Sequence, residues 1–187
     1  MKVKKHNIAI TGANGYLGSC IFNFLANKNY IYKLTRYPKK KNKNEFLFNL
    51  KNSVPINFFK QNKISVLIHC AHDFKETLYK KSYEVNVLPS LQLFKNASTA
   101  GVKKIVFISS MASHYKNNSV YSRIKRDIEK ITIKCDGIII KPSLIVGAKP
   151  GGIFKTINNI VKKFYLIPLI SSNNQSLYTV NDLELCK

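Results

Sequence analysis

Tyr121 and Lys125 lie four residues apart in the segment YSRIK, a spacing that places both side chains on one face of a helix. A tyrosine with the ordinary pKa of about 10 is a poor base at neutral pH, and a nearby ammonium stabilises the phenolate and lowers that pKa. The hydroxyl of Ser110 could hold a substrate oxygen while the tyrosine exchanges its proton. The three side chains therefore predict acid/base chemistry at a hydroxyl or carbonyl group, provided that the fold brings them together.

Three glycines with the spacing G-x-x-G-x-x-G, Gly12, Gly15 and Gly18, follow the apolar run Ile8 to Ile10 and precede a helical pattern. Glycine permits positive φ, a close approach of the backbone to a pyrophosphate and tight packing of helix on strand. The free N–H groups of the helix that follows would point at the phosphates. Turns also need glycine for purely structural reasons, but the strand before the triplet and the strand after its helix favour a nucleotide-binding turn.

The elements that must position these residues alternate along the chain. Apolar runs such as residues 105–108 and 138–140 are continuous, as in strands that are buried on both faces of a parallel sheet. We expect strands at 8–11, 30–35, 45–48, 66–70, 104–109 and 137–141, and helices at 15–27, 53–61, 78–100, 119–134 and 153–164.

This alternation predicts an α/β fold with a Rossmann-like, doubly wound and mostly parallel sheet flanked by helices. Ligands of such sheets bind beyond the carboxyl ends of the strands. We expect a nucleotide-binding domain over residues 1–145 and a short, reduced substrate-binding region over residues 146–187, where the pattern weakens.

The composition is that of a folded soluble protein, since 45% of the 187 residues are hydrophobic and 21% are charged. The sequence lacks an apolar run long enough for a membrane span or a signal peptide, so we expect a cytoplasmic protein. The net charge of +22 would suit an anionic partner. Because Lys, Asn and Ile dominate the whole chain and no basic helix interleaved with aromatics is present, we expect neither nucleic acid nor membrane as the partner.

The four cysteines are widely spaced and form no C-x-x-C pair, which indicates ordinary thiols in a reducing compartment. His69 and His72 flank Cys70 and suggest a metal site. The pair lacks a carboxylate partner at a useful spacing, so we expect no bound metal.

Taken in order, these motifs resemble the NAD-dependent epimerase/dehydratase family, an extended or atypical branch of the short-chain dehydrogenases/reductases that acts largely on nucleotide sugars. The resemblance runs from about Asn7 to Leu183. It rests on the glycine turn and on the segments His69-Cys70-Ala71, Asn86-Val87, Ser109-Ser110, Tyr121-x-x-x-Lys125, Lys141-Pro142-Ser143 and Val180-x-Asp182-Leu183.

The resemblance implies a role for each of these residues. Tyr121 would be the general acid/base, Lys125 would bind the nicotinamide ribose and lower the tyrosine pKa, and Ser110 would position the substrate oxygen. Relatives commonly form dimers through the helix that carries Tyr121, so a homodimer is also implied. The cofactor-binding set implied by the family comprises Gly12, Asn14, Gly15, Tyr16, Leu17, Gly18, Arg36, Asn49, Leu50, Cys70, Ala71, Asn86, Tyr121, Lys125 and Pro142.

The end of the second predicted strand bears on the choice of cofactor. An acidic residue there binds the ribose hydroxyls of NAD, whereas a basic one attracts the 2′-phosphate of NADP. This chain has Arg36 at that place and no acid before Glu45, so we expect NADP(H) in preference to NAD(H). Asn49 stands where relatives often carry the aspartate that meets the adenine.

Three departures from the family pattern leave the function open. The interval from Ser110 to Tyr121 is short, Lys141 replaces the usual arginine, and relatives continue well beyond the position of Leu183. One hypothesis is a working epimerase, dehydratase or reductase with a small sugar pocket. A second is an inactive or truncated nucleotide-binding protein, and a third is a basic nucleic-acid or membrane binder on the same scaffold.

Overall fold

The computed structural model describes residues 5–39, 43–50, 53–114, 118–147, 152–165 and 178–187. Six strands form one sheet in the order β3-β2-β1-β4-β5-β6, and every neighbouring pair is parallel. This is the strand order of a dinucleotide-binding Rossmann sheet, so the predicted fold class is confirmed. The strands are β1 (Asn7–Thr11), β2 (Tyr30–Thr35), β3 (Glu45–Leu47), β4 (Val66–His69), β5 (Lys104–Ile108) and β6 (Ile138–Ile140).

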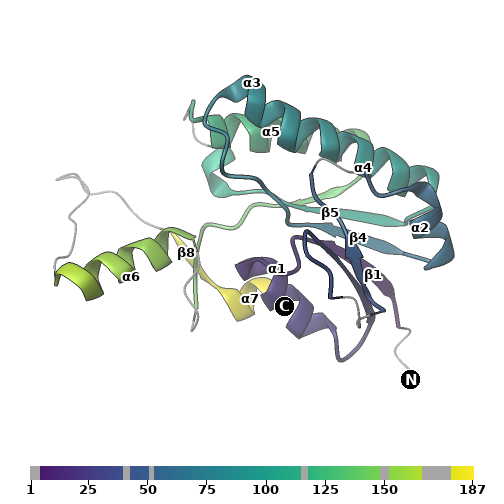
Figure 1. The fold of residues 1–187 in the computed structure, drawn as a ribbon, viewed down its shortest axis with the longest axis horizontal. Coiled ribbons are helices and arrows are strands. Elements are labelled where there is room, and N and C mark those ends of the chain that lie inside the picture. Colours follow the sequence, from purple (N-terminus) through teal and green to yellow (C-terminus); the bar gives the residue numbers. More distant parts are fainter. Residues whose placement is uncertain (1–4, 40–42, 51–52, 115–117, 148–151, 166–177) are drawn as a thin grey trace.

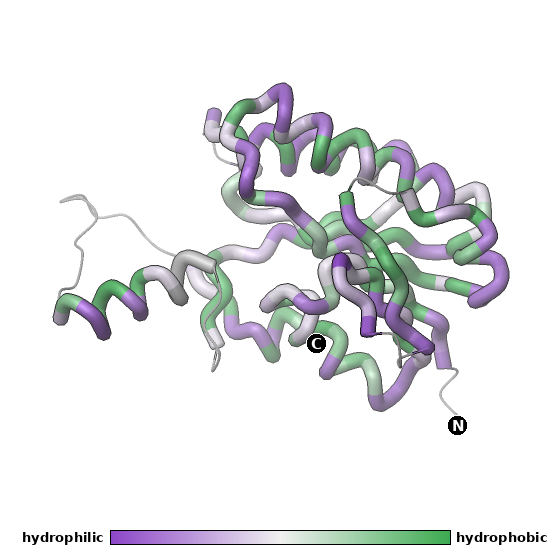
Figure 2. The backbone as a smooth tube through the Cα atoms, in the orientation of Figure 1, coloured by the Kyte–Doolittle hydropathy of each residue, from purple (hydrophilic) through white to green (hydrophobic). Residues whose placement is uncertain are grey.

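Helices cover both faces of the sheet (Figure 1). On one face lie α2 (Ile56–Gln61), α3 (Tyr79–Ser82), α4 (Leu88–Thr99) and α5 (Val120–Lys134), and on the other α1 (Tyr16–Leu25). Successive side chains of each strand therefore enter two different apolar layers. In β1, Ala9 packs with the α4 and α5 layer, while Ile8 and Ile10 pack with the α1 layer. Figure 2 shows the apolar segments gathered along the sheet between these layers.

The helix expected over residues 78–100 is interrupted at Tyr83–Val87 by a π-helical turn between α3 and α4. Such turns insert an extra residue into a helix and are frequent at functional sites. Asn86 lies in this turn and is buried.

The last elements stand apart from the main sheet. The three-residue strands β7 (Leu144–Val146) and β8 (Thr179–Asn181) form a parallel pair of their own, which was not expected from the sequence. The short helix α7 (Asp182–Cys186) contacts α1, whereas α6 (Gly152–Phe164) extends away from the body of the protein (Figure 1). None of the helices that the structure describes combines the length and apolar character needed to cross a membrane.

Candidate functional site

The glycine turn connects β1 to α1 at the carboxyl edge of the sheet. Gly12 has a φ of +67°, and a Cβ there would lie 2.9 Å from the backbone nitrogen of Ala71. A Cβ on Gly18 would overlap the carbonyl of Gly12, so α1 can pack against the turn only with glycine at this position. Gly15 caps α1, and its N–H donates to the carbonyl of Gly12 at 2.8 Å. The turn thus presents backbone and no side chain at these positions, as a phosphate cradle requires.

The ends of β2 and β3 lie beside this turn. The carbonyl of Leu34 accepts the N–H of Gly12 at 3.2 Å, and that of Thr35 accepts the N–H of Phe48 at 2.7 Å. The Thr35 hydroxyl is buried and has no hydrogen-bond partner among the residues that the structure describes, and Arg36 after it is exposed. An orphaned polar atom beside a glycine cradle fits a dinucleotide whose ribose hydroxyls reach the end of β2. Asn49, predicted at the adenine, and Leu50, a predicted cofactor-binding residue, lie two and three residues after the end of β3.

A buried hydrogen-bond chain holds β4 against the turn. Thr11 Oγ1 accepts the N–H groups of Cys70 and Ala71 at 3.1 and 3.2 Å and lies 2.8 Å from Nδ1 of His69, while Nε2 of His69 lies 3.0 Å from the Ser90 hydroxyl. Because that hydroxyl donates its proton to the carbonyl of Asn86, it accepts from Nε2–H, and Nδ1 accepts from Thr11.

His69 is therefore a neutral structural residue with both ring nitrogens in use. Burial, together with the charge of Lys125, lowers its pKa to about 3. Among the described residues, no group of three or more His, Cys, Asp or Glu side chains is arranged to hold a metal ion.

Asn86 fixes the loop that follows β4. Its Oδ1 accepts the N–H of Asp73 at 2.8 Å, and its Nδ2 donates to the carbonyls of Asp73 and Ser82, each at 3.1 Å. The residue is 1% exposed, and its amide is already bonded within the fold. The observed role of Asn86 is to position the loop, and its expected contact with a cofactor ribose stays a prediction.

The three predicted catalytic residues meet where β5 ends and α5 begins. Ser119 caps α5 and accepts the N–H of Ser122 at 3.3 Å, which sets Tyr121 in the first turn. Ser110 lies two residues after β5, and its hydroxyl interacts with the phenol of Tyr121 and opposes the effect of burial on the Tyr121 pKa. Lys125 Nζ lies 5.7 Å from the centre of the Tyr121 ring. The arrangement can therefore pass a proton between Tyr121 and a ligand held at Ser110.

The pKa of Tyr121 differs from the sequence-based expectation. Burial raises it, while the hydrogen bond with Ser110 acts in the opposite direction. The phenol is therefore protonated at neutral pH, and the expectation of a pKa below the ordinary value is wrong for this structure. The reason is that Lys125 is buried within the fold, where its Nζ donates to the carbonyl of Ile108 at 2.9 Å. Burial also lowers the pKa of Lys125 to about 8.

Glu129 was not predicted from the sequence, and it anchors α5, the helix that carries Tyr121 and Lys125. Its carboxylate forms a 2.7 Å ion pair with Lys141, lies 2.6 Å from the hydroxyl of Ser113 and accepts a short hydrogen bond from Ser109. Burial works against its ionisation, but these contacts keep the pKa of Glu129 below its usual value. Lys141, at the place where relatives carry arginine, thus retains a carboxylate partner. The spacing in the sequence could have revealed Glu129, because it lies one helical turn after Lys125 and therefore on the same face of the helix.

The same network separates the two serines. Ser109 is buried and points to Glu129, whereas the partly exposed Ser110 points to Tyr121. Pro142, a predicted cofactor-binding residue, accepts the N–H of Met111 through its carbonyl at 2.9 Å and so ties the segment between β6 and β7 to the loop after Ser110.

Other predicted cofactor residues use their side chains within the fold. Leu17 packs in the apolar layer beneath α1, and Asn14 is exposed in the turn. Tyr16 donates to Asp182 at 3.0 Å, and burial with this bond raises its pKa to about 12. If these residues bind a pyrophosphate, Leu17 does so through its backbone, because its side chain faces away.

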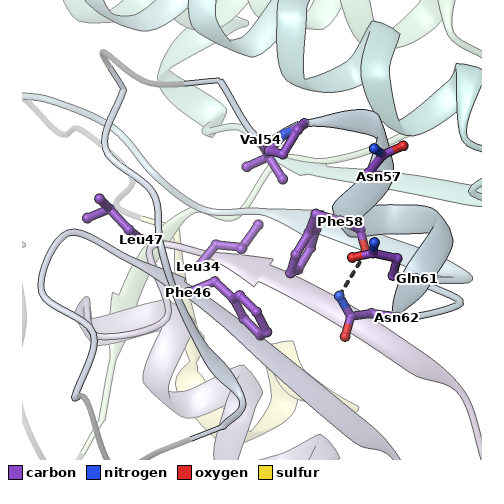
Figure 3. A pocket seen from close by; sticks show the side chains of 9 residues that line it. Leu34, Phe46, Leu47, Val54, Asn57, Phe58, Gln61 and Asn62 are labelled. Atoms are coloured by element: carbon purple, nitrogen blue, oxygen red, sulfur yellow. Dashed lines mark hydrogen bonds between the residues drawn. The ribbon is translucent and has the colours of Figure 1, made fainter.

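A groove on the surface is separate from the three predicted catalytic residues. A groove of ≈ 290 Å³ lies between β2, β3 and α2, where apolar side chains such as Leu34, Phe46 and Phe58 are rimmed by the amides of Asn57 and Gln61 (Figure 3). None of the three predicted catalytic residues lines it.

Comparison with known proteins adds independent findings. The sequence model of the NAD dependent epimerase/dehydratase family matches residues 8–175. The chain is 26% identical to UDP-glucose 4-epimerase of Vibrio cholerae, an alignment that covers 95% of this chain and 64% of that protein. It is also 36% identical over 78 residues to the mitochondrial protein fmp52 of Emericella nidulans, covering 40% of this chain and 31% of that protein.

Solved structures share the fold. An NAD-dependent NDP-hexosamine 5,6-dehydratase, TunA of tunicamycin biosynthesis, superposes with a TM-score of 0.80 at 14% identity, covering 97% of this chain and 70% of its own. The complex of MoeE5 with UDP-glucose and NAD gives a TM-score of 0.78 at 17% identity, covering 96% and 69%. At such identities the likeness concerns the fold. The chain spans less than two thirds of the length of the two curated proteins.

Proposed function

Because the chain belongs to the NAD dependent epimerase/dehydratase family of extended short-chain dehydrogenases/reductases, we propose that it transforms a nucleotide-linked sugar by hydride transfer. The observation that carries this proposal is the convergence of Ser110, Tyr121 and buried Lys125 at the same sheet edge as the glycine turn. The UDP-glucose 4-epimerase and the UDP-glucose complex among its relatives support the substrate class.

The proton chemistry follows from the positions of the side chains. A bound nicotinamide group would supply the hydride acceptor and donor. Ser110 holds the reacting oxygen, and Tyr121 gives a proton to a carbonyl or takes one from a hydroxyl. Since burial raises the Tyr121 pKa, the phenol begins as the acid. For it to take a proton this pKa must fall, a role that we propose for the positive charge of Lys125, 5.7 Å from the ring centre, once a ligand is bound.

Lys125 carries that charge at neutral pH. Its pKa of about 8 keeps most of the ammonium protonated at pH 7, and one of its three N–H groups is bonded to Ile108. We propose that another binds a ribose hydroxyl. Gly12, Gly15 and Gly18 would hold the pyrophosphate, and the end of β2 the adenosine.

Turnover tests the proposal directly. UDP-glucose is incubated with the protein and either NAD⁺ or NADP⁺, and epimer formation is followed by chromatography, because an epimerase regenerates its cofactor and gives a flat absorbance trace. We expect Tyr121→Phe to lower turnover by about 10²- to 10⁴-fold, the usual contribution of a general acid/base, without loss of folding. Dinucleotide binding without turnover of any nucleotide sugar would favour the inactive nucleotide-binding protein instead.

The cofactor choice is a separate part of the proposal. Exposed Arg36 directly after β2, with no carboxylate at that strand end, supports NADP(H) in preference to NAD(H). Titration with NADPH and NADH is expected to show tighter NADPH binding, and Arg36→Asp should reverse the order. An unchanged NADPH affinity in this variant would contradict the assignment. The homodimer stays a prediction.

A further inference from the structure

Three aromatic rings gather at the catalytic tyrosine, and we call His72, Phe74 and Tyr121 the aromatic cluster. The imidazole of His72 stands edge-on to the Tyr121 ring, with centres 5.1 Å apart and planes at 87°. Phe74 stacks on Tyr121 at 5.7 Å and 20°, and lies 4.6 Å from His72. The proposed proton transfer uses Tyr121 but leaves the other two rings without a role.

His72 carries a polar atom with an unmet hydrogen bond. Its Nδ1 is buried and has no partner within the described part of the chain. Burial, with the charge of Lys125, lowers its pKa to about 3, so the imidazole is neutral near pH 7. A buried polar atom without a partner costs free energy and calls for an explanation, and a ligand that supplies the partner is one.

Phe74 is the opposite case, a large apolar ring held in the open. Its side chain is 74% exposed. The backbone beneath it is fixed, because Asn86 bonds both the N–H and the carbonyl of the neighbouring residue Asp73. The ring thus projects from an anchored loop over the catalytic tyrosine, where substrate would enter.

We propose that His72 and Phe74 form the contact for the hexose of the substrate, with Phe74 against the apolar C–H face of the sugar and His72 hydrogen-bonded to a sugar hydroxyl. A hexose carries both features on one ring, an apolar face and a rim of hydroxyls, whereas in uridine diphosphate the flat base and the ribose hydroxyls lie on separate rings. Because the Phe74 ring packs against the imidazole of His72, we expect it to move aside when a sugar hydroxyl reaches Nδ1 of His72. The inference rests on the proposed function and assigns the sugar end of the substrate.

The test uses UDP-glucose and UDP as probes, each in the presence of NADP⁺. Saturation-transfer NMR on the wild type is expected to mark both hexose and uridine protons. In Phe74→Ala the hexose signals should fall several-fold relative to the uridine signals. His72→Phe keeps an aromatic ring but removes the hydrogen bond, and should weaken UDP-glucose binding about tenfold in calorimetry while UDP binding stays unchanged. His72→Asn returns a polar atom near the position of Nδ1 and should recover part of the loss.

Matched measurements separate the possible outcomes. Tyr30→Ala removes an exposed aromatic ring at the first residue of β2, the end away from the carboxyl edge of the sheet. This variant should bind both UDP-glucose and UDP as the wild type does. If the wild type binds UDP-glucose and the Phe74 and His72 variants bind it equally well, this inference is overturned while the proposed function stands. If the wild type binds NADP⁺ or NAD⁺ but neither contacts nor turns over any nucleotide sugar, both are overturned.

Discussion

The carboxyl edge of the sheet has two sides of different character. Behind it lies an inner layer of buried or half-buried polar side chains, each with a hydrogen-bond or ion-pair partner: Thr11, His69, Ser90, Ser109, Glu129 and Lys141. In front lies an open face, the aromatic cluster, with one exposed ring and one nitrogen that has no hydrogen-bond partner among the described residues. The inner layer is complete without a ligand, so its residues should govern stability, whereas the open face should govern ligand binding and turnover.

The largest effect on stability is expected at Glu129. Glu129→Ala leaves Lys141, whose side chain is 23% exposed, without its carboxylate and removes an acceptor from two buried serine hydroxyls, at roughly 1–3 kcal/mol for each buried group left unsatisfied. Urea unfolding measures this loss. The control is Glu184→Ala, which removes an exposed pair with Lys187 and should cost less than about 1 kcal/mol. Equal losses of unfolding free energy in the two variants would contradict a particular role of the inner layer in stability.

A second loss of stability is expected at His69. His69→Ala leaves the hydroxyl proton of Thr11 without its acceptor, at roughly 1–3 kcal/mol for a buried group left unsatisfied, while Ser90 keeps its bond to the carbonyl of Asn86. Thermal and urea unfolding report this change, with exposed His6→Ala as the control. If the His69 variant were as stable as the wild type, the claim that the inner layer governs stability would be contradicted.

The inner layer also predicts a dependence on pH. The pKa of His69 is about 3 in the fold against 6.5 ordinarily, so between these values the unfolded chain binds the extra proton. Stability is therefore retained above pH 6.5 and falls as the pH drops toward 3, by at most about 1.4 kcal/mol per pH unit for this group. Unfolding measured from pH 7 to pH 4 should show a shallower slope in His69→Ala than in the wild type. Because the pKa of His72 is lowered in the same direction, part of the slope should remain.

The smallest effect on stability is expected on the open face. Phe74→Ala removes a mostly exposed ring and should change the free energy of unfolding by less than about 0.5 kcal/mol, as at ordinary surface positions. The same variant should lose hexose contact. A loss of several kcal/mol would mean that the ring packs as core, and the contrast between the two sides would then fail.

The sequence was sufficient for the sheet because its strands are buried on both faces and therefore read as continuous apolar runs. Tyr30–Thr35 has the predicted bounds, and the strands at 66 and 104 end one residue earlier than expected. Strands β7 and β8 were missed, since three residues are too few to show a period.

The site was harder to predict from the sequence. Spacing alone placed Tyr121 and Lys125 on one helix face, but the depth of Lys125, and with it the direction of the Tyr121 pKa shift, depends on how α5 packs on β5. The bonds of His69 to Thr11 and Ser90 join residues from three separate elements, and no local pattern reveals them.

The π-helical turn at Tyr83–Val87 sets the alignment of two anchors that hold different parts of the carboxyl edge. Asn86 holds the loop below Phe74, and Ser90, on the next helical turn, holds His69 beside Thr11 at the end of β1. Each residue of an α-helix advances the chain by about 100° around its axis. Deleting one residue from this turn would therefore rotate one anchor away from its partner while the other stayed in place, so chain length within this segment is under a constraint that no single substitution would reveal.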